Sequence, residues 1–127
     1  MAFEHLRKNN YISVTTFRKN GAPVPTPVWF AHDADRLVVL TLADSGKAKR
    51  LRHTSRVEIA PCDVRGNPKG AYVPAECYII GDEADGQQAD RALNKKYGLQ
   101  KRLFQFFSNL GGKKDTIFLE IYEPKST

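Results

Sequence analysis

A stretch from Arg36 to Asp63 places the strongest constraint on how this chain can fold. Residues 37–42, LVVLTL, form a nearly continuous apolar run, which is typical of a strand buried on both faces. A short segment rich in lysine and arginine comes next, and residues 56–64 then read as a further strand. We expect the rest of the chain to be arranged around these two strands and the basic segment between them.

The basic segment, DSGKAKRLR at residues 44–52, has the residue types that hold a phosphate. Ser45, or the aspartate before it, can cap a short helix, and Gly46 lets a ligand approach the backbone closely. The free N–H groups of the first helical turn would point to the same place as the serine hydroxyl. Lys47 and Arg50 are three residues apart and share one face of such a helix, while its apolar residues share the inward face.

This segment has two interpretations. Each charge-assisted hydrogen bond to a phosphate contributes roughly 1.5 to 3 kcal/mol, so two or three of them hold a nucleotide-type cofactor without a covalent link. Alternatively, the segment is a solvated basic helix end whose charges only complement the helix dipole. The pattern by itself leaves both interpretations open.

The bulk composition predicts one domain over residues 1–127, because a chain of 127 residues can bury a sizeable core. The 20 basic and 14 acidic residues give a net charge of +6 and a pI near 9.4, which favours anionic partners. Phosphorylated small molecules, nucleic acid and polyglutamate-like tails all qualify. Because the aromatic residues are not interleaved with the basic ones as stacking platforms, we expect no nucleic-acid partner.

Two cysteines, Cys62 and Cys77, indicate the compartment. They form no C-x-x-C pair and have no histidine at ligand spacing, so neither a structural zinc site nor a redox dithiol is indicated. We expect buried thiols in a reducing compartment. The first residues have no features of a leader, and no apolar run approaches the length that spans a membrane. The expectation is a cytoplasmic, soluble protein without a membrane partner.

Apolar periodicity predicts six strands, the first three of which form an antiparallel meander. The expected strands are residues 11–18, 23–32, 37–42, 56–64, 71–84 and 115–123. Residues 3–8 are expected to form a short helix, and apolar spacings of three and four predict two helices within residues 86–109, broken at Gly98. These elements predict a mainly β fold, a six-stranded antiparallel β-barrel with helical additions.

The second of these helices is rich in aromatic residues. We interpret Phe104, Phe106 and Phe107 as core or dimer contacts in preference to a ligand box. The glycine and lysine pairs that follow lack the spacing and the hydroxyl residue of a phosphate loop.

Three prolines at alternate positions, Pro23, Pro25 and Pro27, mark the second expected strand. Each removes a possible ladder donor, so this strand must have an open edge or a bend. Trp29 and Phe30 follow directly, and a strand with unpaired backbone beside them is a plausible wall for a flat cofactor ring. An edge strand that its prolines protect from aggregation is an equally good interpretation.

No catalytic residue and no metal site can be assigned from the motifs. His5, His32 and His53 have no partners at spacings that build a metal site or a nucleophile triad, and the sequence contains no G-x-S-x-G, H-E-x-x-H or G-x-G-x-x-G. If the protein is an enzyme, a bound cofactor must supply the reactive group.

Two motifs carry a family resemblance. P-x-P-V-W-F at residues 25–30 and T-x-A-D-S-G-K-x-K-R-L at residues 41–51 resemble the pyridoxamine 5′-phosphate oxidase-like split-barrel flavoprotein superfamily. More narrowly, they resemble its subgroup of oxidoreductases that use the deazaflavin coenzyme F420. The resemblance covers nearly the whole chain. It implies a split β-barrel, a homodimer with the cofactor at its interface, and hydride transfer to or from a small-molecule substrate.

The resemblance also implies which residues contact the cofactor. Its phosphate would be held by the side chains that follow the third strand, its ribityl chain would border the end of that strand, and its ring would lie against the proline-rich strand. These residues are, in that order, Ser45, Lys47, Lys49 and Arg50, then Thr41, then Pro27, Val28 and Trp29.

Two departures from the family pattern leave alternatives. Many relatives have arginine at the position of Ser45 and asparagine at the position of Arg50, so FMN is the alternative to coenzyme F420. The chain also ends at Thr127, without the substrate-binding extension of pyridoxamine phosphate oxidases, so pyridoxamine phosphate is not the expected substrate. A protein that binds a flavin or F420 without turning it over is a further alternative.

Overall fold

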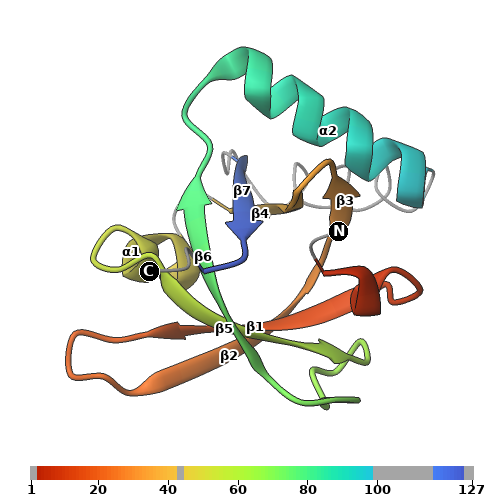
Figure 1. The fold of residues 1–127 in the computed structure, drawn as a ribbon. Coiled ribbons are helices and arrows are strands. Elements are labelled where there is room, and N and C mark those ends of the chain that lie inside the picture. The colour runs from red at the N-terminus through yellow and green to blue at the C-terminus, as the bar shows by residue number, and fades with distance from the viewer. Residues whose placement is uncertain (1–2, 43–44, 99–115, 125–127) are drawn as a thin grey trace.

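The computed structural model describes residues 3–42, 45–98 and 116–124, and these build one antiparallel sheet of seven strands with helices packed against it. The strands are β1 (Tyr11–Phe17), β2 (Pro23–Trp29), β3 (Ala31–Asp33), β4 (Arg36–Leu42), β5 (Arg56–Cys62), β6 (Val73–Ile79) and β7 (Thr116–Tyr122). The helices are the short 3-10 turn η1 (Glu4–Leu6), α1 (Gly46–Leu51) and α2 (Glu83–Tyr97). The strand order across the sheet is β2-β1-β5-β6-β7-β4-β3 (Figure 1).

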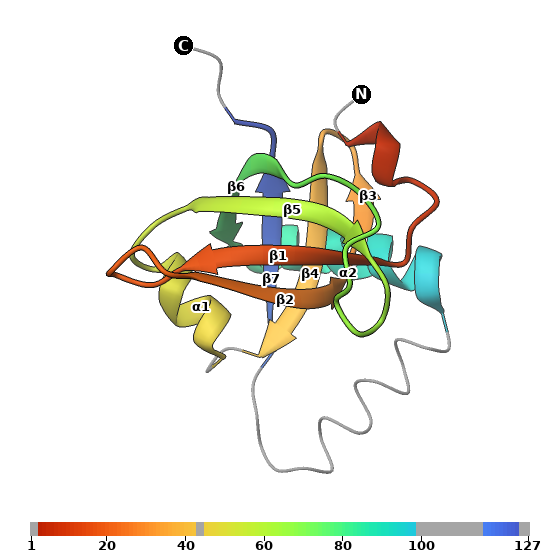
Figure 2. The same cartoon turned by 90° about the horizontal axis from the view of Figure 1, so that it is seen from below.

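The sheet curls so strongly that its two ends cross. Figure 2 shows β1, β2 and β5 running across β4 and β7, with α2 behind them. The inner face of the curl holds the main apolar cluster, which includes the completely buried side chains of Ile12, Leu37 and Ile59. The outer face of β4 packs against α2 through a second cluster around Val38 and Leu93. The result is a half-barrel with one covered outer face, as expected for a mainly β fold.

The number of strands differs from the expected six. Residues 23–32 form two strands and not one, because the Tyr97 hydroxyl of α2 hydrogen-bonds the backbone N–H and carbonyl of Phe30, which lies between the two strands. The phenol oxygen accepts a hydrogen bond from the Phe30 N–H at 3.0 Å and lies 2.5 Å from the Phe30 carbonyl oxygen. Because its N–H and its carbonyl both bond Tyr97, Phe30 cannot continue the backbone hydrogen bonding between β2 and β1. The chain turns there, and Ala31 pairs instead with Val38 of β4.

The prolines lie where the sequence predicts an open edge. β2 is the first strand of the sheet and pairs only with β1 among the described residues. Pro23, Pro25 and Pro27 are all exposed. Since they have no N–H to donate, Val24 and Thr26 between them carry the bonds to β1, and the free edge offers carbonyl acceptors at the proline positions.

Other boundaries also have local causes. The expected strand 71–84 is shorter in the structure, because the Asp82 side chain accepts a hydrogen bond from the Asp85 N–H and starts α2 there. The predicted break at Gly98 is confirmed, since this residue ends α2 with a φ of +56°. The second expected helix, with Phe104, Phe106 and Phe107, lies outside the described residues.

Both cysteines are buried free thiols, as predicted, and burial raises the pKa of Cys77 to about 12. Among the described helices, none combines the length and the apolar character that crossing a bilayer requires.

A buried arginine ties α2 to the sheet. Arg36, at the start of β4, is 7% exposed and bonds three carboxylates from three elements. Its guanidinium donates to Asp33 and Asp85 at 2.7 Å and to Glu120 at 2.8 Å. These bonds satisfy a charge that burial alone would penalise, so the cluster fixes the position of α2 over the sheet.

Replacing Tyr97 with phenylalanine should lower the free energy of unfolding by about 1 to 3 kcal/mol, because it leaves the buried Phe30 N–H without an acceptor. Urea denaturation at neutral pH measures this difference. Tyr78→Phe is the matched control, since its hydroxyl bonds only at the surface and its loss should change stability by less than about 0.5 kcal/mol. Equal stability of the Tyr97→Phe and wild-type proteins would contradict the role given to this hydroxyl.

Arg36→Met should destabilise the protein by about 2 kcal/mol or more at pH 7. The loss should be smaller than that for a fully buried ion pair, because the Asp85 side chain is 35% exposed and solvent weakens its attraction to Arg36. The hydrogen bond from Arg36 lowers the pKa of Asp85. A lowered carboxyl pKa stabilises the fold above the unfolded value and stops doing so as the pH falls through the folded value. The difference between wild type and variant should therefore shrink below about pH 4. Arg91→Met, on the exposed side of α2, should show neither effect.

Candidate functional site

Helix α1 closes one end of the curled sheet between β4 and β5, and it contacts β1 and β6 (Figure 1). Ala48 and Leu51 are buried, which confirms the predicted inward face. Ser45 caps the helix, since its Oγ accepts a hydrogen bond from the Ala48 N–H at 3.2 Å. The predicted cap and the predicted amphipathic helix are therefore both present, and they fix the direction in which the basic side chains leave the backbone.

Lys47 is the most unusual side chain of this helix. It is only 8% exposed, and within the described part of the chain no hydrogen bond or ion pair to it is found. Burial lowers the pKa of Lys47, and the neighbouring charge of Arg50 lowers it further. A lysine in this state is held at an energetic cost unless an anion comes to it.

Arg50 lies beside Lys47 and is oriented by two contacts. Its Nε donates a hydrogen bond to Oγ1 of Thr16 in β1 at 2.5 Å. Its guanidinium packs against Gly46, where an added Cβ would lie 2.7 Å from Nη1. Gly46 therefore makes room for the arginine, which occupies the space beside the backbone where we expected a ligand. Burial and the charge of Arg18 lower the pKa of Arg50.

The remaining residues of the predicted phosphate set occupy different environments. Lys49 points away from the sheet and is exposed, and Ser45 is half-buried. Thr41 is 8% exposed and pairs with Ile117 of β7 near the end of β4. The structure thus brings Ser45, Lys47 and Arg50 together on one short helix, with Thr41 at the end of the strand that precedes it.

The predicted ring-backing residues point to different sides of β2. Val28 belongs to the inner apolar cluster and is 8% exposed. The Trp29 ring faces outward and stacks on Tyr97, with 5.2 Å between centroids and 15° between planes. Pro27 is exposed on the outer face, where its ring lies 3.4 Å from the position of a Cβ on Gly66. Of the three side chains, only that of Pro27 is open to a ligand over much of its surface.

Sequence reasoning missed the residues that position the cations. Thr16 bonds Arg50 across 34 positions of the chain, and Cys77 of β6 is close enough for its thiol and Lys47 to affect each other's pKa. Neither residue belongs to a motif. The adjacent threonines of β1 signal a strand only. In the described ranges, no three histidine, cysteine or acidic side chains gather as a metal ligand set.

Comparisons with solved structures find the same fold at low sequence identity. The heme storage protein HutZ from Vibrio cholerae is similar with a TM-score of 0.71 at 14% identity, over 99% of this chain and 93% of that one. An FAD-binding protein from Mesorhizobium loti gives 0.66 at 16% identity, over 94% of this chain and 83% of that one. A pyridoxamine 5′-phosphate oxidase-related, FMN-binding protein from Nostoc punctiforme gives 0.59 at 14% identity, over 91% and 70%.

At the level of sequence, none of the curated proteins compared with this chain matches it. The family model described as pyridoxamine 5′-phosphate oxidase, however, matches residues 2–120. Since this match covers nearly the whole chain and agrees with the curled antiparallel sheet, the protein belongs to the pyridoxamine 5′-phosphate oxidase family.

Proposed function

We propose that this protein is an oxidoreductase that uses the deazaflavin coenzyme F420 and holds the cofactor phosphate at α1. One observation carries this proposal, namely the pair of cations Lys47 and Arg50, close together and without a carboxylate partner in the described residues. A phosphate supplies the missing negative charge and accepts several hydrogen bonds at once. The family and the structures described as binding FAD and FMN support a flavin-type cofactor.

The residues present fit a phosphate in three respects. Lys47 is nearly buried, so a bound anion would be shielded from the solvent that weakens surface ion pairs. The Thr16 hydroxyl uses only the Nε of Arg50 and leaves its terminal nitrogens available to a second acceptor. Ser45 and the exposed Lys49 lie on the same short helix and are the further ligands of this proposal.

The bound deazaflavin would supply the hydride, and the chain would bind and orient it. Thr41 would border the ribityl chain, and the outer side of β2 at Pro27, with the Val28 and Trp29 backbone, would back the ring. No acid or base from the protein is part of the proposal, since orientation and exclusion of water are the contributions such a site makes. The substrate class is a small organic molecule with an unsaturated or carbonyl-type group.

The proposed assembly is a homodimer with the ring at the subunit interface. Within the described ranges, part of the outer face of β2 is uncovered, and in the family pattern a second subunit completes the site. Sedimentation equilibrium should therefore give twice the chain mass of 14.3 kDa at micromolar concentrations. A protein that stays monomeric while it binds the cofactor would remove the interface from the proposal.

Titration of the purified protein with coenzyme F420, followed by cofactor fluorescence, tests the phosphate site. Lys47→Met and Arg50→Gln should each weaken binding roughly tenfold or more, because each removes a charge-assisted hydrogen bond. Arg91→Met, which removes an exposed positive charge on α2, is the matched control and should leave the affinity unchanged. Unchanged affinity in both site variants would refute the site. A parallel titration with FMN decides between the two cofactors.

The same Lys47→Met variant should be more stable than wild type when no cofactor is present, by roughly 1 kcal/mol at pH 7, because it removes a largely buried charge that has no carboxylate partner among the described residues. The lowered pKa of Lys47 means that folding disfavours its charged form. This penalty is present at neutral pH and fades as the pH rises toward about 10, where the unfolded lysine also loses its proton. Thermal unfolding at pH 7 and pH 9.5 measures both effects. A destabilised variant would show that Lys47 has a structural partner.

Turnover separates an enzyme from a binding protein. Reduced F420 should be oxidised in the presence of a suitable acceptor, which a panel of small carbonyl and unsaturated compounds can identify by loss of the reduced-cofactor absorbance. Tight binding without oxidation by any acceptor would instead favour a protein that stores or delivers the cofactor.

A further inference from the structure

A second basic site lies far from α1, at the other side of the sheet. A pocket of about 340 Å³ opens between η1, β3 and the last turns of α2. It is lined by Arg7, Ala31, His32, Ala92, Lys95 and Lys96. Of these described residues, the four with titratable side chains are all basic and the other two are alanines. Its volume is at the lower end of the range for pockets that hold small ligands.

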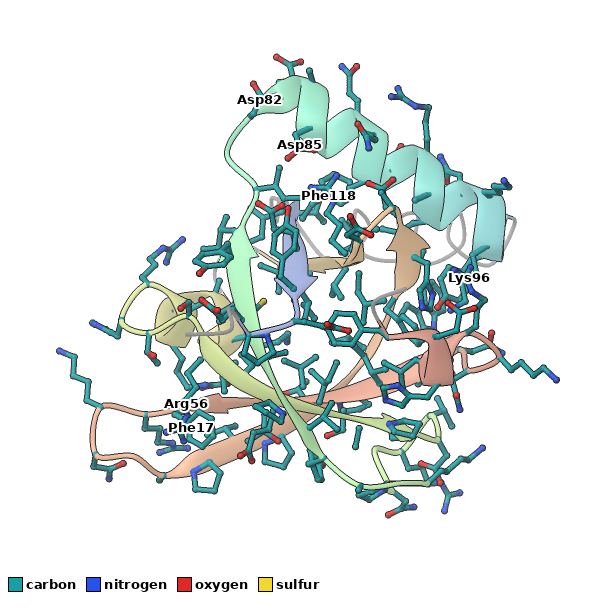
Figure 3. The ribbon with its side chains drawn as sticks, in the orientation of Figure 1. Phe17, Arg56, Asp82, Asp85, Lys96 and Phe118 are labelled. Atoms are coloured by element: carbon teal, nitrogen blue, oxygen red, sulfur yellow. The ribbon has the colours of Figure 1, made fainter. Side chains whose placement is uncertain are left out.

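Lys96 is positioned at this pocket by uncharged partners. Its Nζ donates a hydrogen bond to the carbonyl oxygen of Asn9 at 2.7 Å and lies 3.6 Å from the centre of the Phe30 ring. Figure 3 shows it at the end of α2, beside the N-terminal segment. Burial without a carboxylate lowers the pKa of Lys96 to about 8. The lysine remains mostly charged at neutral pH, with two further protons to donate.

His32 contributes from β3. Its Nε2 is hydrogen-bonded to the Phe3 carbonyl oxygen at 3.0 Å, so Nε2 carries a proton and Nδ1 is the free nitrogen among the described contacts. Burial lowers the pKa of His32, and the charges of Arg7 and Lys96 lower it further, whereas the hydrogen bond to the Phe3 carbonyl and the charge of Glu4 act in the opposite direction. Negative charge brought near the ring would raise the pKa of His32 and so favour a proton on Nδ1.

Arg7 and Lys95 complete the positive rim. Arg7 forms an exposed ion pair with Glu4 through its Nε at 2.8 Å, so its terminal nitrogens remain available to bind an anion. Lys95 has no partner among the residues that the structure describes. The two lysines in the last turn of α2 also complement the helix dipole. That role does not explain why Arg7 and His32, from other parts of the chain, line the same pocket.

We propose that this pocket binds a small anion, the phosphate or carboxylate group of a metabolite, between α2 and the N-terminal segment. Positive groups from three parts of the chain line it, Ala31 and Ala92 leave room for it, and Glu4 is exposed and paired with Arg7. The site is separate from the proposed cofactor phosphate site, because α1 lies at the opposite side of the sheet (Figure 1).

The histidines allow each site to be followed by itself. In an NMR titration of the full chain with inorganic phosphate at pH 6.5 and constant ionic strength, the His32 ring signals should shift in a saturable way, and the pKa of His32 should rise. His53 lies two residues after α1, where its N–H bonds the Arg50 carbonyl oxygen, so its ring signals should respond to phosphate bound at that helix. Succinate in a parallel titration distinguishes carboxylate from phosphate ligands. Saturation by either anion supports the site and identifies its ligand class, and saturation by neither overturns it.

Substitutions separate a formed pocket from general positive charge. Lys95→Gln and Lys96→Gln should each weaken the binding seen at His32 about tenfold, and the glutamine at 96 can still donate to Asn9. Ala92→Leu fills the pocket without changing its charge and should also weaken binding at His32, but not at His53. Lys69→Gln should change neither signal. If the His32 response persists in both Lys95→Gln and Ala92→Leu, the anion does not occupy this pocket and the proposal is wrong.

Discussion

The hydroxyl of Tyr97 determines how the sheet and α2 fit together. It accepts the Phe30 N–H and shares its one proton between the carbonyl oxygens of Phe30 and Asn10, at 2.5 and 2.7 Å. One side chain from the end of α2 thereby bonds the start of β1 and the junction of β2 with β3. Its ring also stacks on Trp29, and the next residue back along α2, Lys96, covers Phe30. The strand break, the helix position and the shape of the basic pocket depend on this contact.

Much of the fold follows from local sequence signals. Alternate prolines indicated the edge strand, Gly98 indicated the end of α2, and the spacing of Ala48 and Leu51 indicated the inner face of α1. What could not be predicted joins residues far apart in the chain. Tyr97 and Phe30 are 67 positions apart, and no pattern near either residue announces a hydrogen bond that ends one strand and starts another. A period-2 run therefore predicted one strand where the fold has two.

The grouping of basic residues at the candidate phosphate site could be predicted because it is local in the sequence. Its residues lie within one short segment, so helical spacing alone places Lys47 beside Arg50. Thr16, which orients the arginine, comes from another strand, and its contact depends on how the sheet curls. The residues that the motif predicts to back a ring show the limit of such a motif, because alternation along β2 turns Val28 inward while Trp29 meets Tyr97. A motif specifies neighbours in sequence, whereas the sheet decides which side chains reach a ligand.

The buried and half-buried cations of this protein divide into two kinds. Arg36 is surrounded by three carboxylates, so its charge is satisfied within the fold and its role is structural. Lys47 and Lys96 have no carboxylate among the described residues, and burial lowers the pKa of both. Substituting Arg36 removes ion pairs that the fold already contains, whereas substituting either lysine removes a positive charge that lacks a carboxylate partner among the described residues. Stability should therefore fall in the first case, and ligand affinity in the second.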